Sequence, residues 1–137
     1  MQISTKTEYA LRALSELALS QSDKPLSIAE ICSKQYLPHK YVEQLFRKLK
    51  KSELVVSSHG AQGGYNLTKP ASEISLKNIM QAVDENYLKN FCSDKTRAEH
   101  CLGTKCGFHQ LWDEIRSDLE TYFDSIKLDR IIAKLED

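Results

Sequence analysis

The feature that most restricts the fold of this chain is a pair of short helical patterns followed directly by a glycine-rich hairpin. The first helix opens with Ser27 and Glu30, which have the spacing of a capping box. The second is expected over residues 38–51, where Pro38 suits the first turn because its missing N–H costs nothing there. Its inward stripe, at i, i+3, i+4 and i+7, consists of Val42, Leu45, Phe46 and Leu49. The spacing predicts a helix-turn-helix over about residues 27–51.

Strand patterns on either side of a polar turn predict a small two-stranded wing over residues 54–68. Glycine permits the backbone conformations that such a turn requires, and the turn holds Gly60, Gly63 and Gly64. Another apolar helical pattern, which Ser4 or Thr5 can cap, precedes the helix pair. Three helices followed by a glycine-tipped hairpin predict a mainly α fold, a winged helix-turn-helix.

The rest of the chain divides by its apolar periodicity. A helix is expected after the wing, so that residues 1–84 form the winged helix-turn-helix region with a following helix. Residues 85–106 show no periodicity, and residues 107–137 predict a long helix and a short C-terminal helix. The length of 137 residues suits one compact domain overall.

The long helix carries an apolar seam with alternating steps of four and three residues. Its members are Phe108, Trp112, Ile115, Leu119, Tyr122 and Ile126. A helix this apolar needs a partner, either in the same domain or in a second copy of the chain. The first 70 residues can already bury their own apolar stripes, which favours a long C-terminal dimerisation helix.

The formal net charge is zero, with 19 Lys and Arg against 19 Asp and Glu, but the charges are unevenly placed. Residues 1–69 hold ten basic and six acidic side chains, whereas residues 70–137 hold nine and thirteen. Residues 38–51 alone hold five basic side chains and one acidic. Phosphate binding depends on local rather than net charge, so this segment is typical of a nucleic-acid footprint. The other interpretation is a solvated helix face.

Three of the four cysteines lie in the segment without periodicity. Cys92, Cys101 and Cys106 are followed by His109 in the pattern C-x8-C-x4-C-x2-H. A long irregular loop is uncommon in a small domain unless something holds it, and three thiolates can bind a soft metal centre. On spacing alone a Cys₃His zinc site leads, with a redox disulfide switch as the alternative. Cys32 is expected to be a small buried hydrophobe.

Several motifs together resemble the IscR/NsrR-type winged-helix regulators of the bacterial Rrf2 superfamily. Two of them cover the second helix and the wing: Tyr41-Val42-Glu43-Gln44-Leu45-Phe46 and His59-Gly60-Ala61-Gln62-Gly63-Gly64-Tyr65. The others are Ser4-Thr5-Lys6-Thr7-Glu8-Tyr9-Ala10-Leu11-Arg12-Ala13, Ala82-Val83-Asp84-Glu85 and Leu111-Trp112, so the resemblance spans essentially the whole chain. The family usually has arginine where this sequence has His59, and a neutral histidine would hold a minor groove less firmly.

The resemblance implies a homodimeric transcriptional regulator that senses iron–sulfur, redox or nitric oxide status through an iron–sulfur cluster. The implied cluster ligands are Cys92, Cys101 and Cys106. IscR-like members, the closest in pattern, place a histidine at the position of His109 and hold a 2Fe–2S cluster, the arrangement that we favour. NsrR-like members supply a carboxylate at the position of Glu8, which reaches the other subunit's cluster and implies a 4Fe–4S centre that reacts with nitric oxide. A structural zinc site is the remaining alternative.

The expected partner is double-stranded DNA with a pseudo-palindromic operator, because the second helix of a helix-turn-helix enters the major groove. Lysine and arginine can read guanine, glutamine can pair with adenine, and glutamate can accept from cytosine. Lys48, Lys50 and Lys51 are better placed to bind phosphates. The residues assigned to this interface are Lys6, Lys40, Tyr41, Glu43, Gln44, Arg47, Lys48, Lys51, His59, Gly60, Gly63 and Gly64.

The sequence argues against other classes of protein. It has no phosphate-binding glycine loop, dinucleotide fingerprint or nucleophile elbow, so no enzyme is expected. An electron carrier would have no use for a basic helix and a wing. No apolar run reaches the roughly 18 residues of a membrane span, and the polar N-terminus is unlike a signal peptide. A cytoplasmic location is therefore expected.

Overall fold

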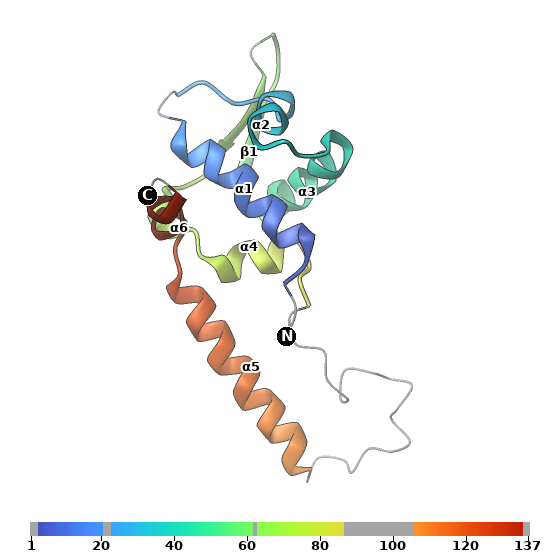
Figure 1. Ribbon diagram of the computed structural model, residues 1–137, viewed down its shortest axis with the longest axis vertical. Helices are drawn as coiled ribbons and strands as arrows, with labels where there is room; N and C mark the ends of the chain where they lie inside the picture. Colours follow the sequence, from blue (N-terminus) through green and yellow to red (C-terminus); the bar gives the residue numbers. More distant parts are fainter. Residues whose placement is uncertain (1–2, 21–22, 62, 87–105, 136–137) are drawn as a thin grey trace.

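The computed structural model describes residues 3–20, 23–61, 63–86 and 106–135 (Figure 1). These residues form a mainly helical structure with one two-stranded antiparallel sheet. The elements in chain order are α1 (Thr5–Leu19), α2 (Ile28–Gln35), α3 (His39–Lys51), β1 (Val55–Ser58), β2 (Gly64–Leu67), the 3-10 helix η1 (Ala71–Glu73), α4 (Leu76–Ala82), α5 (Gly107–Ser125) and α6 (Leu128–Leu135). The predicted winged helix-turn-helix and the long C-terminal helix are both present.

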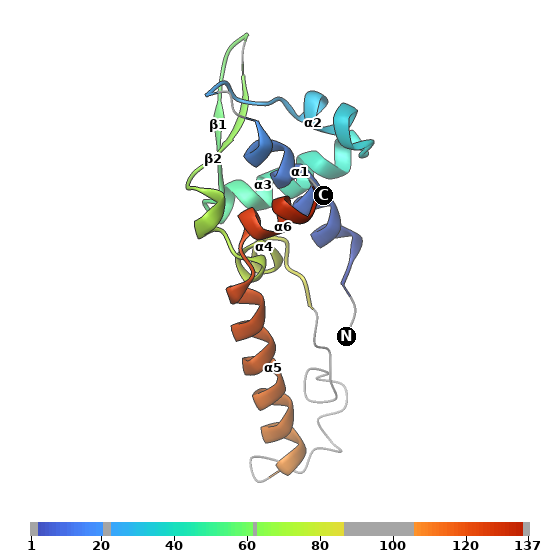
Figure 2. The same cartoon turned by 60° about the vertical axis from the view of Figure 1, so that its left-hand side comes forward.

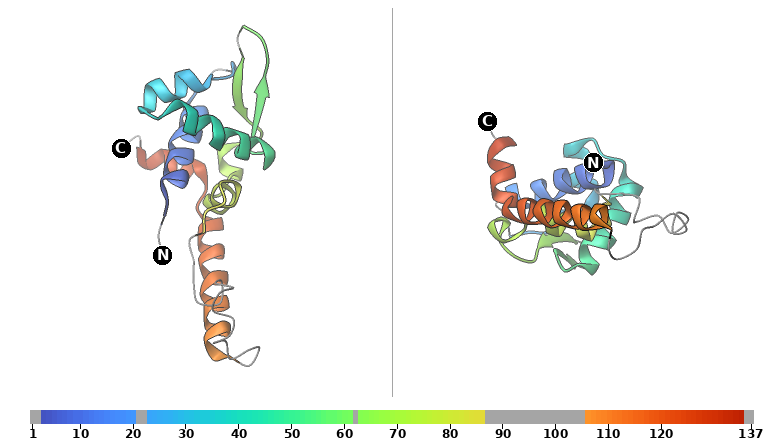
Figure 3. Two further views of the ribbon diagram at one scale, coloured as in Figure 1. Left: turned by 90° about the vertical axis from the view of Figure 1, so that its right-hand side faces the viewer. Right: turned by 90° about the horizontal axis from the view of Figure 1, so that it is seen from below.

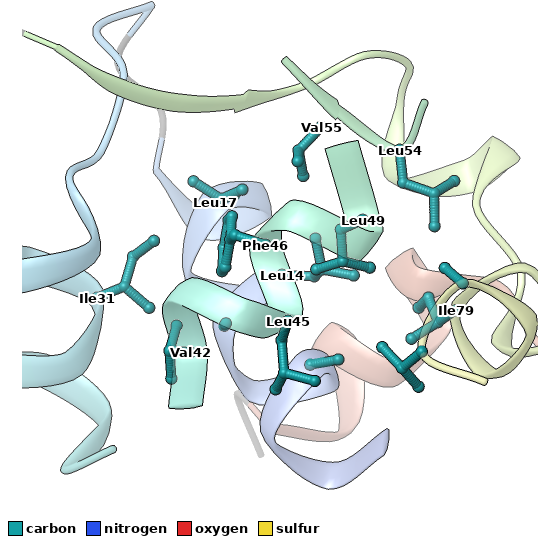
Figure 4. Packing of buried hydrophobic residues seen from close by; sticks show 14 of the residues in the cluster. Leu14, Leu17, Ile31, Val42, Leu45, Phe46, Leu49, Leu54, Val55 and Ile79 are labelled. Carbon is teal, nitrogen blue, oxygen red and sulfur yellow. The ribbon is translucent and has the colours of Figure 1, made fainter. Parts of the chain in front are cut away.

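Helices α1, α2, α3, α4 and α6 pack around one apolar core, which we call the bundle (Figure 4). The inward stripe predicted for α3 is buried at its centre, and Phe46 and Leu49 are fully enclosed. Strand β1 adds Val55 to the same core, which fixes the base of the wing against α3. Burial of these side chains therefore determines which face of α3 stays outside.

The predicted N-terminal residues agree with the structure for α2 but not fully for α3. Ser27 is the N-cap of α2, and its hydroxyl accepts a hydrogen bond from the Glu30 N–H at 3.1 Å, as predicted. Pro38 was expected in the first turn of α3, but it is the N-cap residue, and α3 begins at His39. The reason is backbone conformation, because Pro38 has an extended ψ of 123°.

The wing is an antiparallel pair in which Val55 faces Leu67 and Ser58 faces Gly64. The segment before α2 joins it along one edge, where the backbones of Leu26 and Tyr65 exchange two hydrogen bonds of 3.1 and 2.8 Å. The ring of Tyr65 in turn packs against Phe46, with ring centroids 4.7 Å apart. The wing is thus tied both to the first segment of the helix-turn-helix and to α3.

Helix α5 runs away from the bundle, on the side opposite the wing tip (Figures 1 and 2). Only its last turns meet the bundle, where Phe123 is buried beside Met80 of α4. After α5, Lys127 forms an isolated antiparallel β-bridge with Ser75, and α6 then packs on α1 and η1. The first turn of α5 and the first turn of α1 therefore lie far apart in one chain (Figure 1).

Candidate DNA interface and metal-ligating segment

Helix α3 presents a continuous polar face to the outside of the bundle. Lys40, Gln44, Arg47 and Lys51 follow one another at steps of four, three and four residues, and all are exposed. In the left view of Figure 3, α3 crosses the near side of the bundle and the wing stands beside it. We call these four residues the exposed stripe of α3. An uncovered basic helix next to a wing has the form of a major-groove reader.

Two other residues assigned to the interface lie at the margins of this face. Tyr41 is half-buried, and its ring meets that of Tyr9 in α1 edge-on, with centroids 5.6 Å apart. Glu43 is paired with His39, whose Nδ1 lies 3.2 Å from Glu43 Oε1. Tyr41 thus contributes to packing between α1 and α3, and Glu43 has a cationic neighbour when His39 is protonated.

The basic residues Lys6 and Lys48 converge on Asp84, just after α4. Lys48 Nζ lies 3.1 Å from Asp84 Oδ2, and Lys6 Nζ donates to the Asp84 carbonyl at 3.1 Å. Asp84 has a positive φ of 57°, so the chain turns sharply here. Two side chains assigned to the DNA interface are therefore held beside the final turn of α4.

Glu85, the next residue, binds the first turn of α1. Its Oε2 accepts hydrogen bonds from the Ser4 N–H at 3.0 Å, from the Ser4 hydroxyl, and from the Thr7 hydroxyl at 2.5 Å. Burial alone would raise the pKa of Glu85, but the hydrogen bonds from Ser4 and Thr7 and the charge of Lys6 together hold that pKa below its usual value. We call Asp84 and Glu85 the 84–85 corner.

The turn of the wing separates into an outer and an inner part. His59 and Gly60 are exposed, and Gly60 has a φ of 110° with open space where a Cβ would stand. Gly64 is different, because a Cβ there would lie 2.4 Å from both the carbonyl carbon and the carbonyl oxygen of Leu26. The outer residues are free to meet a groove, whereas Gly64 allows the close approach of the wing to the segment before α2.

Two of the candidate ligands that the structure describes, Cys106 and His109, share the first turn of α5. Cys106 is the N-cap residue and is buried, and His109 lies three residues later with its side chain half exposed. His109 Nε2 is 3.3 Å from Asp113 Oδ2, which leaves Nδ1 for a metal. Cysteine sulfur and histidine nitrogen both bind soft metals, and a carboxylate partner fixes the ring of a ligating histidine. The chemistry of this donor set fits a soft metal centre.

The other candidate ligands are not brought together with this turn. Cys92 and Cys101 lie outside the described residues. Glu8 is exposed on α1, with its Oε1 4.0 Å from the Arg12 guanidinium. Helix α1 lies well away from the start of α5 in the same chain (Figure 1). Within the described part of the chain, no group of three metal-ligating side chains occurs. Cys32 is buried as expected, and burial, followed by the charge of Glu43, raises the pKa of its thiol.

The apolar seam of α5 is largely uncovered in the single chain. Phe108 is 63% exposed, Ile115 36% and Tyr122 58%, while Trp112 and Leu119 are half-buried. Ile126 falls beyond the helix, where its extended backbone accepts a hydrogen bond from the Leu76 N–H at 2.8 Å. The helical part of the seam therefore ends at Tyr122.

Sequence reasoning missed the 84–85 corner and the pairing of His39 with Glu43. The His39 pair could have been found from its i, i+4 spacing. The corner has no such local signal, since its partners are Ser4, Thr7 and Lys48, all distant in sequence.

Among the described residues, no helix is both long and apolar enough to cross a bilayer.

Comparison with known proteins places this arrangement in a family. Residues 3–134 match the Rrf2 family, described as an iron-dependent transcriptional regulator. The HTH-type transcriptional regulator IscR of Aliivibrio salmonicida is 35% identical over 137 residues, which cover 99% of this chain and 80% of that protein.

Solved structures agree with the sequence match. The structure of T. potens IscR superimposes with a TM-score of 0.74 at 30% identity, covering 98% of this chain and 88% of that one. CymR, the global cysteine regulator of B. subtilis, gives a TM-score of 0.76 at 26% identity, covering 98% of both chains. The chain belongs to the Rrf2 family and is a winged-helix transcriptional regulator of the IscR type.

Proposed function

We propose that this protein is a homodimeric regulator that binds operator DNA with an affinity set by an iron–sulfur cluster, held by Cys92, Cys101, Cys106 and His109. The observation that carries the proposal is the structure on either side of the cysteine-containing segment. At one end, the 84–85 corner binds α1 and α3. At the other, Cys106 and His109 share the first turn of the uncovered helix α5.

The exposed stripe of α3 supports the DNA-binding half of the proposal. Arg47 and Gln44 have side chains suited to guanine and adenine edges, and neither is covered by the bundle. Lys40 and Lys51 extend the positive charge towards the two ends of the helix, where it would meet phosphates. His59 and Gly60 at the outer part of the wing would enter a neighbouring minor groove.

The first turn of α5 supports a cluster with histidine ligation. Cys106 at the N-cap would supply a sulfur ligand, and Asp113 would orient the His109 ring. When bound, a 2Fe–2S cluster supplies a redox-active centre, and histidine ligation raises its reduction potential. Cys106 and His109 would hold the cluster at the first turn of α5, and Asp84 and Glu85 bind the bundle just before the cysteine-containing segment.

Two alternatives use the same cysteines. In the first, Glu8 is the fourth ligand of a 4Fe–4S cluster in the partner subunit, and its exposure on α1 is compatible with that role. In the second, zinc occupies a structural Cys₃His site. The shared first turn of Cys106 and His109 favours the histidine-ligated cluster over the first alternative, and metal content separates it from the second.

The exposed seam of α5 supports a dimer. Phe108, Ile115 and Tyr122 are apolar side chains on one face of a helix that projects from the bundle. A second copy of α5 packed along this face would bury them and hold two α3 helices at a fixed spacing. Symmetric dimers of this kind bind pseudo-palindromic operators, because two reading helices meet two half-sites.

Coupling between cluster and DNA would pass through the 84–85 corner. Cys92, Cys101 and Cys106, which would hold the cluster, lie in the segment that follows Asp84 and Glu85, and these two residues hold Lys48 on α3 and the start of α1. A change in the segment would therefore alter the charge and pose of α3 in each subunit. Such a coupling is a difference in DNA affinity between two states of one protein.

The test is an anaerobic absorption spectrum of the purified dimer with its iron, sulfide and zinc content, before and after exposure to nitric oxide. The proposal predicts iron and sulfide in equal amounts and a visible spectrum that changes when His109 is replaced by Ala. Glu8→Ala should leave the spectrum unchanged. Zinc without iron, or a spectrum that responds to Glu8→Ala and not to His109→Ala, would overturn the assignment.

A further inference from the structure

We infer that Tyr36, in the turn between α2 and α3, contacts the phosphate backbone of bound DNA, an inference that rests on the proposed DNA interface. Tyr36 is 92% exposed, the highest value among the exposed large apolar side chains of the described residues. It also adopts the left-handed backbone conformation, with φ 55° and ψ 47°. This combination has no explanation in the packing of the single chain.

The backbone conformation of Tyr36 is costly for its residue type. A left-handed residue at the end of a helix is usually glycine, because a Cβ is unfavourable there. A strained residue persists where the surroundings enforce it, and such residues gather at functional sites. Because the ring is exposed, no burial energy offsets the strain. We therefore expect the ring to contact a partner molecule.

The turn that carries Tyr36 is rigid. The N–H groups of Tyr36 and Leu37 both donate to the carbonyl of Cys32, and the Leu37 side chain is buried. From α1, the Arg12 guanidinium binds the carbonyl of Gln35, which directly precedes Tyr36. The side chain of Tyr36 is therefore presented from a fixed backbone rather than from a loose loop.

The position of this turn in the fold selects DNA as the partner. In a helix-turn-helix the first helix crosses the DNA backbone and the second lies in the groove, so the turn between them passes over the phosphates. The neighbouring exposed side chains include Lys34 and Lys40, whose charges favour an anionic surface. A tyrosine hydroxyl is a common donor to phosphate oxygen. Tyr36 would donate this bond and fix the register of α3 in the groove.

The experiment measures binding of a fluorescent random-sequence duplex at several salt concentrations, because a phosphate contact does not depend on base sequence. Tyr36→Phe removes only the hydroxyl, and it should weaken binding roughly tenfold. The slope of log affinity against log salt should stay unchanged, since no charge is lost. Lys40→Ala, in contrast, should reduce that slope by about 1. Ser117→Ala, which removes an exposed hydroxyl from α5 outside the seam, is the control and should bind as the parent does.

A second variant separates strain from contact. Tyr36→Gly relieves the left-handed strain, so it should raise the thermal midpoint while weakening duplex binding at least as much as Tyr36→Phe. If both Tyr36 variants bind like the parent while Lys40→Ala is weakened, the inference about Tyr36 is wrong and the DNA interface stands. If the parent itself shows no salt-dependent binding, the proposed function fails instead.

Discussion

Lys48 of α3 and Asp84, beside the last turn of α4, form an ion pair with 3.1 Å between Lys48 Nζ and Asp84 Oδ2. Asp84 also accepts a hydrogen bond from Lys6 through its carbonyl. The same Lys48 was assigned to DNA phosphates from the sequence. The Asp84 carboxylate would therefore compete with DNA phosphates for Lys48.

Replacing Asp84 with Asn should release Lys48 for phosphate. Both side chains are more than one-third exposed, so the change in folding stability should stay within about 1 kcal/mol. Affinity for a random-sequence duplex should rise, and the salt slope should steepen by about 0.9 if Lys48 gains one phosphate. Asp118→Asn on α5 makes the same charge change away from α3. An equal gain from Asp118→Asn would show that only net charge matters.

Glu85→Gln should destabilise the fold in a pH-dependent way. The folded pKa of Glu85 lies below the ordinary value of 4.5, so its charged form adds stability above about pH 4.5, and this contribution disappears as pH falls through the folded value. At neutral pH the loss of charge-assisted bonds from Ser4 and Thr7 should cost about 1–2 kcal/mol. Urea unfolding at neutral and acidic pH measures the difference between variant and parent.

The exposed Glu114→Gln, which lies on α5, is the control for this measurement and should show little change at either pH. A Glu85→Gln deficit that is the same at both pH values would contradict the role assigned to the ionised carboxylate. The outcome bears on the proposed coupling, because Glu85 ties the start of α1 to the residues that precede the cysteine-containing segment.

Local patterns in the sequence were sufficient for most of the fold. The apolar stripe of α3, the cap at Ser27 and the glycine-tipped hairpin are each set by neighbours within a few residues, and the structure confirms them. The exposed faces followed directly, because burying Val42 and Leu49 leaves Arg47 outside. The predicted helix boundaries were less accurate, since Pro38 precedes α3 and does not lie in its first turn.

Contacts between distant residues could not be predicted from one chain. Glu85 was only part of a motif in the sequence, whereas in the structure it receives three hydrogen bonds at the start of α1. Tyr36 gave no signal, because its left-handed conformation depends on how the α2–α3 turn is held by Cys32 and by Arg12. The cluster ligands Cys92 and Cys101 remain predictions, as do the dimer contacts of α5.

Gly64→Ala tests the close approach of the wing to the segment before α2. The added Cβ would lie 2.4 Å from the Leu26 carbonyl, so backbone must move, and the cost should be about 1–3 kcal/mol. Gly107→Ala is the control, because nothing lies within 4 Å of its Cβ and alanine favours a helix. Thermal unfolding should show a lower midpoint for Gly64→Ala and an equal or higher one for Gly107→Ala. Equal midpoints for both would contradict the packing described here.

Ile115→Glu tests the dimer. A carboxylate in the middle of the apolar seam would be buried without a partner if a second α5 covered it, so the variant should sediment as a monomer. Ser117→Glu adds the same charge to an exposed position of α5 outside the seam and should leave the dimer intact. A parent protein that is itself monomeric at micromolar concentration would refute the assigned interface.

The most direct test of the central claim is the affinity of one protein for one operator in two cluster states. The operator is first selected by the anaerobic protein from a random pool of duplexes, and binding is then measured before and after the cluster is removed. We predict that affinity changes on cluster removal, and that Cys92→Ser, lacking visible absorbance, binds with the affinity of the cluster-free parent. A Cys92→Ser variant with the parent's spectrum, or an affinity that is the same in both states, would contradict the account.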